Sequence, residues 1–444
     1  MNAGVSDVTG DMTRRTSDGA LALLLLLIVL LSTGSFSPEL IDASRNDLLQ
    51  QALVEVLWIA VVAIALPRLR LERYAWDPRI GAIAAFVFYG ALSSLWSSDG
   101  VSAMMKGGAM TFNILAVFLL AAVLRFEVVV GVLVAGLALL DLASLALVIL
   151  MPDIGLVQTW QHAGQWSGVF EQKQTLGITS AMLLYLTAMR LPARGDLGWR
   201  ALHLAIAALA TACILGSGSR GGGGLALAAA ALGFFSDRSR LVRAVAAVTP
   251  VLASAVALGL LSMLVVSDRD VLNFGAGDVD LTDRTRIWKH ALDWVGGGNL
   301  IFGSGLNGFW SRKDVADAFW GGHGWFLDNY HNGYLAVLGD CGLVGVVLLA
   351  AVTLSLASAG VGNGLPRETS QKNLSMGFVA LFYLINVTET YLLRSTNLAA
   401  LIFFFFAFRL LSTEAAAPAE GTDENPPAPA PAVGTPLPGP VEAN

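Results

Sequence analysis

The chain is poor in residues that carry charge, form disulfides or bind metals. Only 14% of its 444 residues are charged, and it has two cysteines and five histidines. A soluble domain carries about a quarter charged residues, so this shortage argues against a water-soluble protein. The net charge of -6 also argues against a nucleic-acid partner, which requires a basic face on the protein.

The scarce cysteines and histidines restrict cofactor chemistry as well. Cys213 and Cys341 both lie in apolar stretches, so we interpret them as core residues rather than as a disulfide or metal pair. The other histidines show no metal-ligand spacing with His331, so we predict no metal and no cofactor. Residues 216–221 and 303–308 match the glycine pattern of dinucleotide-binding turns, but neither follows a predicted strand, and we reject that function.

Apolar residues are abundant instead, at 55% of the chain, and the mean hydropathy is +0.66. Apolar runs of about 17–25 residues are typical of transmembrane helices. The sequence therefore predicts an all-α polytopic membrane protein with about 12 such helices, by this length criterion. The predicted segments are 20–36, 50–67, 80–96, 107–124, 126–150, 174–190, 201–217, 222–236, 242–266, 332–358, 374–392 and 396–412.

The distribution of Lys and Arg predicts that both termini are cytoplasmic, because basic residues concentrate in the loops that this orientation places inside. The expected organisation is a cytoplasmic tail (1–19), helices one to nine (20–266), a long outer loop (267–330), helices ten to twelve (331–412) and a second cytoplasmic tail (413–444). The second tail is rich in Pro and Ala and is expected to be disordered.

Cations collect in the loops predicted to lie outside. Lys173 and Arg220 sit at helix starts, where they either anchor the helix ends at the membrane surface or bind an anion. Arg284 and Arg286 precede Trp288 in an amphipathic stretch. These arginines either pair with nearby aspartates or form a guanidinium fork that binds pyrophosphate.

A single histidine, His331, stands where the long loop meets the next apolar run. Imidazole exchanges protons near neutral pH, so it is the natural general base for a sugar hydroxyl. Asp328 is the neighbouring carboxylate that we expect to orient it. Glu389 and Arg394 bracket a later outer turn, where they either pair with each other or line the same site.

These residues resemble a known family. His331-Asn332, nine residues, Gly342, two residues and Gly345 are similar to the His-Asn-x9-Gly-x2-Gly pattern of the O-antigen ligase and polymerase superfamily. The Ser-Arg-Gly turn at 219–221 resembles the one that opens that family's conserved region. Arg286 fits the Arg-x10-Gly pattern of O-antigen polymerases. We interpret Gly342 and Gly345 as packing positions of the helix after His331.

Within the superfamily, residues 168–177 resemble the Gly-x-Phe-x-x-Lys-Asn-x-Leu-Gly segment of ExoQ-type exopolysaccharide polymerases, and residues 92–98 resemble their Ser-x-x-Trp-Ser turn. Gln174 replaces the usual Asn, while Lys173 is retained. Because ligases typically lack the lysine segment, the resemblance favours a polymerase.

The resemblance implies a metal-independent, inverting glycosyltransferase of the GT-C type in the bacterial inner membrane, with its active site facing the periplasm. The growing undecaprenyl-pyrophosphate-linked glycan would be the donor, and an incoming lipid-linked repeat unit the acceptor. His331 would be the general base. Flippases and chain-length regulators or export proteins are the implied partners. The implied pyrophosphate ligands are Arg220, Arg284, Arg286 and Lys173, and the candidate supporting residues are Asp328, Asn332, Glu389 and Arg394.

Two other functions remain open from the sequence. One is an O-antigen ligase, which would transfer the glycan to lipid A core or to a protein. The other is a transporter or flippase, which would need charged residues and broken helices near the bilayer midplane. The polar residues of this chain crowd one side instead, which disfavours a transporter.

Overall fold

The computed structural model describes most of the chain. The described residues are 3–32, 43–69, 74–158, 162–191, 196–236, 239–267, 272–273, 278–279, 284–296, 299–323, 329–361, 366–394 and 397–414. Asp328 and residues 415–444 of the predicted C-terminal tail lie outside these ranges.

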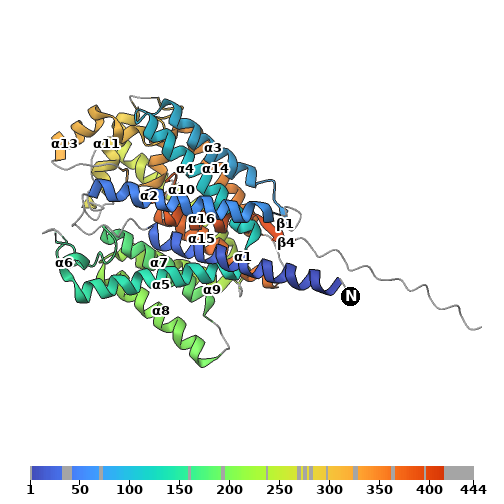
Figure 1. Cartoon of the computed structure of the whole chain (residues 1–444). Helices are drawn as coiled ribbons and strands as arrows, with labels where there is room; N and C mark the ends of the chain where they lie inside the picture. The colour runs from blue at the N-terminus through green and yellow to red at the C-terminus, as the bar shows by residue number, and fades with distance from the viewer. Residues whose placement is uncertain are drawn as a thin grey trace, which may run out of the picture.

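The protein is a bundle of long helices (Figure 1). A helix occurs in each of the twelve segments predicted to span the membrane. These helices are α1 (Ala3–Leu31), α2 (Ala43–Ala65), α3 (Ile80–Leu92), α4 (Val101–Val123), α5 (Phe126–Leu150), α7 (Lys173–Arg190), α8 (Leu197–Gly216), α9 (Arg220–Ser236), α10 (Arg240–Ser267), α14 (Gly333–Val361), α15 (Pro366–Ile385) and α16 (Leu398–Leu410).

Within the described residues, six helices are long and apolar enough to cross a membrane, namely α2, α4, α5, α8, α10 and α14. Three further apolar helices within the described ranges are shorter, at 16–31, 80–96 and 398–410. Many leucines and valines of these helices are exposed on the bundle surface, where hydrocarbon can cover them. The prediction of an all-α polytopic membrane protein is therefore confirmed.

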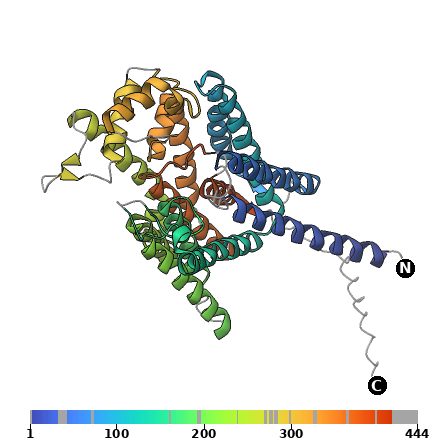
Figure 2. The same cartoon turned by 60° about the vertical axis from the view of Figure 1, so that its left-hand side comes forward.

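Smaller elements cap the two ends of the bundle. At one end lie α6 (Pro152–Gly155), α11 (Arg284–Gly296), α12 (Gly308–Ser311), α13 (Lys313–His323) and the hairpin of β2 (Leu272–Asn273) and β3 (Asp278–Val279). At the opposite end, β1 (Tyr74–Trp76) pairs antiparallel with β4 (Ser412–Glu414). Figures 1 and 2 place the N-terminus at that opposite end, away from α11 and α13. α1 itself begins at Ala3, inside the segment predicted as an N-terminal tail.

α15 holds the centre of the bundle. It packs against α7, α9, α10, α14 and α16. The following helix, α16, is buried along nearly its whole length by a run of phenylalanines, and Phe382 of α15 stacks on Phe403 with ring centroids 4.2 Å apart. Burial of aromatic rings contributes strongly to the stability of a protein core. The packed α15–α16 pair therefore holds the ends of the loop that connects these two helices.

Two further helices differ from the prediction in ways that shape the site. α14 is broken at Gly342, whose φ of 63° and ψ of -163° are not helical. The backbone of residues 300–305 fills the break: Leu343 and Val344 donate to the carbonyls of Leu300 and Ile301, at 2.9 and 3.2 Å. A Cβ at Gly342 would lie 2.4 Å from the Ile301 carbonyl oxygen. Gly342 is therefore a position of close packing, as predicted, but it also breaks α14, and the neighbour that packs there is the loop 300–305.

The second difference is the end of α15, which stops at Ile385 although the apolar run predicts a helix to 392. Asn386 is fully buried, and its side-chain Oδ1 accepts hydrogen bonds from the backbone N–H groups of Tyr391 and Leu392, both at 3.0 Å. This side chain replaces the helical acceptors and folds residues 386–394 into a turn. The turn faces a cavity.

Candidate active site

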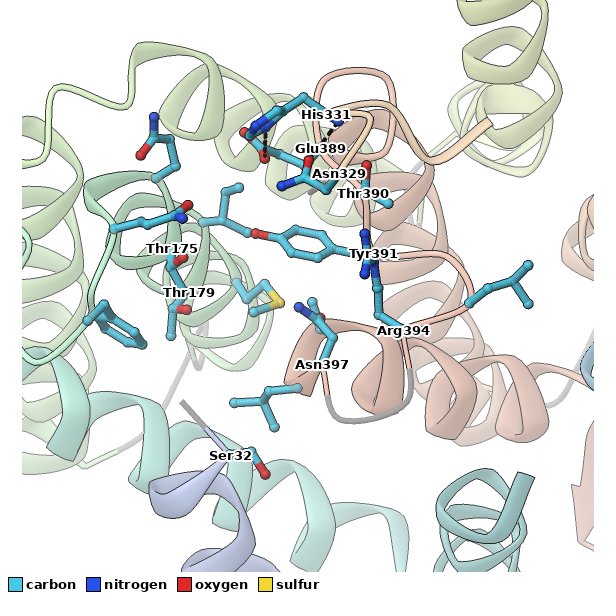
Figure 3. A pocket seen from close by; sticks show the side chains of 18 of the residues that line it. Ser32, Thr175, Thr179, Asn329, His331, Glu389, Thr390, Tyr391, Arg394 and Asn397 are labelled. Carbon is cyan, nitrogen blue, oxygen red and sulfur yellow. Dashed lines mark hydrogen bonds and ion pairs between the residues drawn. The ribbon is translucent and has the colours of Figure 1, made fainter. Parts of the chain in front are cut away.

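A cavity of about 420 Å³ opens at the end of the bundle that carries α11 and α13. That volume is within the usual range of small-molecule sites. Segments far apart in the sequence meet around it (Figure 3), and most of the lining side chains are polar, including Gln172, Gln174, Thr175, Thr179, Asn307, Asn329, His331, Glu389, Thr390, Tyr391, Arg394 and Asn397. The loops predicted to lie outside the membrane thus come together at one site.

His331 is held at the edge of this cavity by its backbone. Its φ of 47° is in the left-handed region, which is unusual for a residue with a side chain. The Asn329 side chain accepts the His331 N–H at 2.8 Å, and the indole N–H of buried Trp288 donates to the Tyr330 carbonyl at 3.1 Å. Strained backbone that is fixed by its surroundings is typical of functional sites.

Asn332 joins the histidine segment to the turn after α15. Its side-chain oxygen accepts the N–H groups of Tyr334 and Leu335 and so caps α14, while its own N–H donates to the Thr390 hydroxyl at 3.0 Å. The Asn332 amide also donates to the Val387 carbonyl. Because Asn332 is fully buried and these bonds engage both its side-chain oxygen and its amide nitrogen, we interpret it as a residue that positions the site.

Glu389 connects the histidine to an arginine. Its Oε1 lies 2.5 Å from Nη2 of Arg284, and its Oε2 lies 3.6 Å from Nδ1 of His331. Arg284 and Trp288 are one turn apart on α11, so they share a face. One of them holds Glu389, and the other holds the backbone beside His331. A single helix face thus sets the relative position of cation, carboxylate and imidazole.

The other cations approach from α7 and from the turn before α9. Lys173 donates to the Gln165 side chain at 2.5 Å, and burial, with a smaller contribution from Arg284, lowers the pKa of its ammonium group. The loop that carries Gln165 packs on residues 216–218, since Trp166 donates to the Gly216 carbonyl at 2.9 Å. Arg220 begins α9 two residues later. The segments of Lys173 and Arg220 therefore adjoin each other.

Arg394 contacts Asn307 and not Glu389, the partner considered for it from the sequence. It donates to the Asn307 side chain at 3.2 Å, whereas Glu389 pairs with Arg284, so the interpretation of Glu389 and Arg394 as a mutual ion pair was wrong. Asp340, a buried residue of α14, accepts the Asn307 N–H and the hydroxyl of Tyr330. Arg394 thus belongs to a polar chain that leads from the cavity to the residue beside His331.

The remaining predicted site residues either are not among the described residues that line the cavity or lie outside the described parts of the chain. Arg286 is half-buried on α11 and, two residues from Arg284, projects from another face of that helix. The side chain of Arg220 and all of Asp328 lie outside the described parts of the chain. Of the cations named above, Arg394 lines the cavity, while Lys173, Arg284 and Arg286 are not among its described lining residues.

Sequence reasoning missed several residues that shape the site. Asn386 and Thr390 lie in a run predicted to be helix, and Asn329 forms the turn before His331. Tyr391 reaches across the cavity toward the side of Thr175 (Figure 3). Burial, and secondly the Glu389 carboxylate, raise the pKa of Tyr391, so this phenol serves as a hydrogen-bonding group and not as a base. One asparagine inside an apolar run, Asn386, was the available signal.

Chemically, the site offers one imidazole, one carboxylate and several permanent cations beside a polar cavity. No group of three or more His, Cys, Asp or Glu side chains within the described ranges is arranged to hold a metal ion. A base next to cations can remove a proton from a hydroxyl while an anionic leaving group departs.

Residues 205–350 match a family model described as O-antigen ligase. This segment is similar to the O-antigen ligase family. It runs from α8 into α14 and contains the turn before Arg220, the arginines of α11 and the His331 motif. The match supports the O-antigen ligase/polymerase superfamily, an activity of ligase or polymerase type, and lipid-linked glycans as substrates in a membrane. No curated protein matches the chain.

Two supporting elements lie outside the matched segment. Thr175 of α7 precedes it and Glu389 follows it, and both line the cavity. The cavity is therefore completed by parts of the chain on either side of the matched segment.

Proposed function

We propose that the protein is a polysaccharide polymerase of the GT-C type at the periplasmic face of the bacterial inner membrane. It transfers a growing glycan from undecaprenyl pyrophosphate to a hydroxyl of an incoming lipid-linked repeat unit. The observation that carries the proposal is the position of Glu389 between Arg284 and His331 at the wall of a polar cavity. It places a cation for the leaving group close to a base for the acceptor.

In the proposed reaction, the acceptor oxygen attacks the anomeric carbon of the donor and its proton passes to His331. Nδ1 of His331 faces Glu389, so Nε2 is the nitrogen that takes the proton. The bond between the anomeric carbon and the pyrophosphate oxygen breaks as the new glycosidic bond forms, with inversion. Arg284 and Lys173, with Arg220, stabilise the negative charge on the departing pyrophosphate.

The carboxylate that orients His331 is proposed to be Glu389. Its Oε2 lies 3.6 Å from Nδ1 of His331, which supports this assignment, while Asp328 lies outside the described residues. Of the two arginines on α11, Arg284 is the proposed pyrophosphate ligand, because it is the one that pairs with a cavity-lining carboxylate. Arg286 projects from a different face of the helix.

An O-antigen ligase is the second candidate, because the matched family model carries that description. Both reactions use the same donor and the same base and differ in the acceptor. The lysine segment at 168–177, which resembles polymerases, supports the first candidate.

The test is a transfer assay with purified protein. The enzyme is incubated with synthetic lipid-linked repeat units, with or without lipid A core, and the glycans are separated on a gel. A ladder of lengthening products supports a polymerase, and transfer only to lipid A core indicates a ligase. We expect His331→Ala to reduce either product at least about 100-fold, whereas His162→Ala, in another outer loop, retains activity. A His331→Ala enzyme with the wild-type rate would contradict the proposed mechanism.

A further inference from the structure

The two oxygens of the Glu389 carboxylate have unequal partners. One forms a 2.5 Å contact with Arg284, while the other stops 3.6 Å from His331 Nδ1. A separation of 3.6 Å is too long for a hydrogen bond, and His331 Nδ1 is buried without a hydrogen-bond partner among the described residues. In this structure Glu389 is thus engaged by the arginine and not by the imidazole.

The partner of Arg284 can be exchanged. A guanidinium binds carboxylates and phosphates through the same planar pair of N–H donors. A diphosphate carries more negative charge than one carboxylate, and Lys173 is close enough to Arg284 to contribute to the attraction. A diphosphate at this place would therefore compete with Glu389 for the guanidinium.

We propose that Glu389 couples donor binding to the general base. The pyrophosphate of the donor takes Arg284 from Glu389, and the released carboxylate closes on Nδ1 of His331. This inference rests on the proposed function. It makes Glu389 a positioning residue, because it acts on the acceptor hydroxyl only through His331. The base then gains its orienting partner only when a donor is bound.

The required movement is small. Shortening 3.6 Å to an ordinary hydrogen bond needs a shift of roughly 1 Å, which a rotation of the Glu389 side chain provides. The backbones on both sides are fixed, by Asn386 in the turn after α15 and by Asn329 and Trp288 around His331. Within the described residues, the charged or titratable groups with a stated interaction with Glu389 are His331, Arg284 and Tyr391.

Glu389→Gln distinguishes this coupling from a purely structural role. Glutamine has the same shape but no charge, so it competes weakly for Arg284 and is a poor acceptor for an imidazolium. We expect the variant to bind inorganic pyrophosphate about fivefold more tightly than wild type, equivalent to about 1 kcal/mol, by calorimetry of protein in lipid nanodiscs. We expect its turnover to fall at least about tenfold. The control Asp153→Asn, on the same end of the bundle, should change neither.

Several outcomes would overturn the coupling. Pyrophosphate binding that is weaker or unchanged in Glu389→Gln would show that the carboxylate does not compete for Arg284. Tighter binding with normal turnover would show that Glu389 does not serve His331. If instead wild-type protein binds pyrophosphate with the expected difference between variants but makes no glycan, the proposed function fails and the exchange at Arg284 stands.

A second measurement needs no variant of Glu389. The chain has five histidines, so protein labelled with 15N-histidine gives few signals, and His331→Gln identifies the one of interest. Inorganic pyrophosphate should move the Nδ1 signal of His331 to the position of a hydrogen-bonded N–H and leave the other four in place. An unmoved His331 signal at saturating pyrophosphate would contradict the proposal.

Discussion

The carbonyl of Asn386 accepts the backbone N–H of Gly333 at 2.8 Å, which joins the end of α15 to the start of α14. This bond is part of the set that holds Glu389 opposite His331. A Cβ at Gly333 would lie 2.2 Å from the Asn386 side-chain oxygen. The start of α14 and the end of α15 are therefore too close for a side chain at position 333. The site depends on this junction more than on either helix alone.

Asn386→Ala should therefore damage both stability and activity. It leaves the N–H groups of Tyr391 and Leu392 without an acceptor in a buried place, and each such loss costs about 1–3 kcal/mol. We expect a clear drop in melting temperature by differential scanning fluorimetry in detergent. Asn397→Ala, which removes only the N-cap of α16, should cost about 1 kcal/mol. Equal losses in the two variants would contradict this role of Asn386.

Gly342→Ala tests the break in α14. The substitution combines a positive φ with a clash against the Ile301 carbonyl, so we expect a loss of at least about 2 kcal/mol in the free energy of unfolding. Gly259→Ala is the matched control, because a Cβ at this helical position meets no atom within 4 Å. It should be neutral or stabilising by up to about 1 kcal/mol. The melting temperatures of the two variants measure the difference. A Gly342→Ala protein that melts no lower than Gly259→Ala would contradict the requirement for glycine at the break.

Arg284 and Arg286 should differ in their kinetic roles. Because Arg284 holds the cavity-lining carboxylate, Arg284→Gln is expected to raise the KM for the lipid-linked donor at least about tenfold, the loss of one charged hydrogen bond. Arg286→Gln, from another face of α11, should raise it less. Initial rates at varied donor concentration measure both. A larger effect from Arg286→Gln would reassign the pyrophosphate ligand.

The lowered pKa of Lys173 predicts that the stability of the folded protein depends on pH. Burial, and secondly Arg284, lower the pKa of Lys173 below the usual 10.5 of lysine, so its charged form costs the folded state stability. That cost is fully present below the lowered pKa and disappears as pH rises toward 10.5. The melting temperature of wild type relative to Lys173→Met should therefore rise between pH 7 and about 10.5. If the difference in melting temperature falls over this pH range, the pKa of Lys173 is not lowered in the folded protein.

The sequence was enough to predict the helices, because long apolar runs allow few other structures in a membrane. It did not show where α14 breaks or where α15 ends. Val387, Leu392 and Leu393 continue an apolar run, and the turn among them depends on contacts that the side chain and backbone of Asn386 make. Those contacts arise only once α14 and α15 are packed together.

The candidate site was predicted in part for similar reasons. His331 was found because a lone titratable residue at the end of an apolar run is conspicuous. The sequence suggests Asp328 as the orienting carboxylate, and that residue lies outside the described ranges. Glu389, the carboxylate that the described structure shows near the imidazole, follows α15 and is 58 positions away in the sequence. Pairings of this kind are set by tertiary packing, and local sequence does not encode them visibly.

The most direct test of the account is a double-mutant cycle between His331 and Glu389, measured as single-turnover glycan transfer from a lipid-linked donor. If Glu389 acts through the imidazole, His331→Ala combined with Glu389→Gln should transfer no more slowly than His331→Ala alone, within about twofold. If the two losses multiply, the residues act independently, and the proposed base and its partner do not form one catalytic unit.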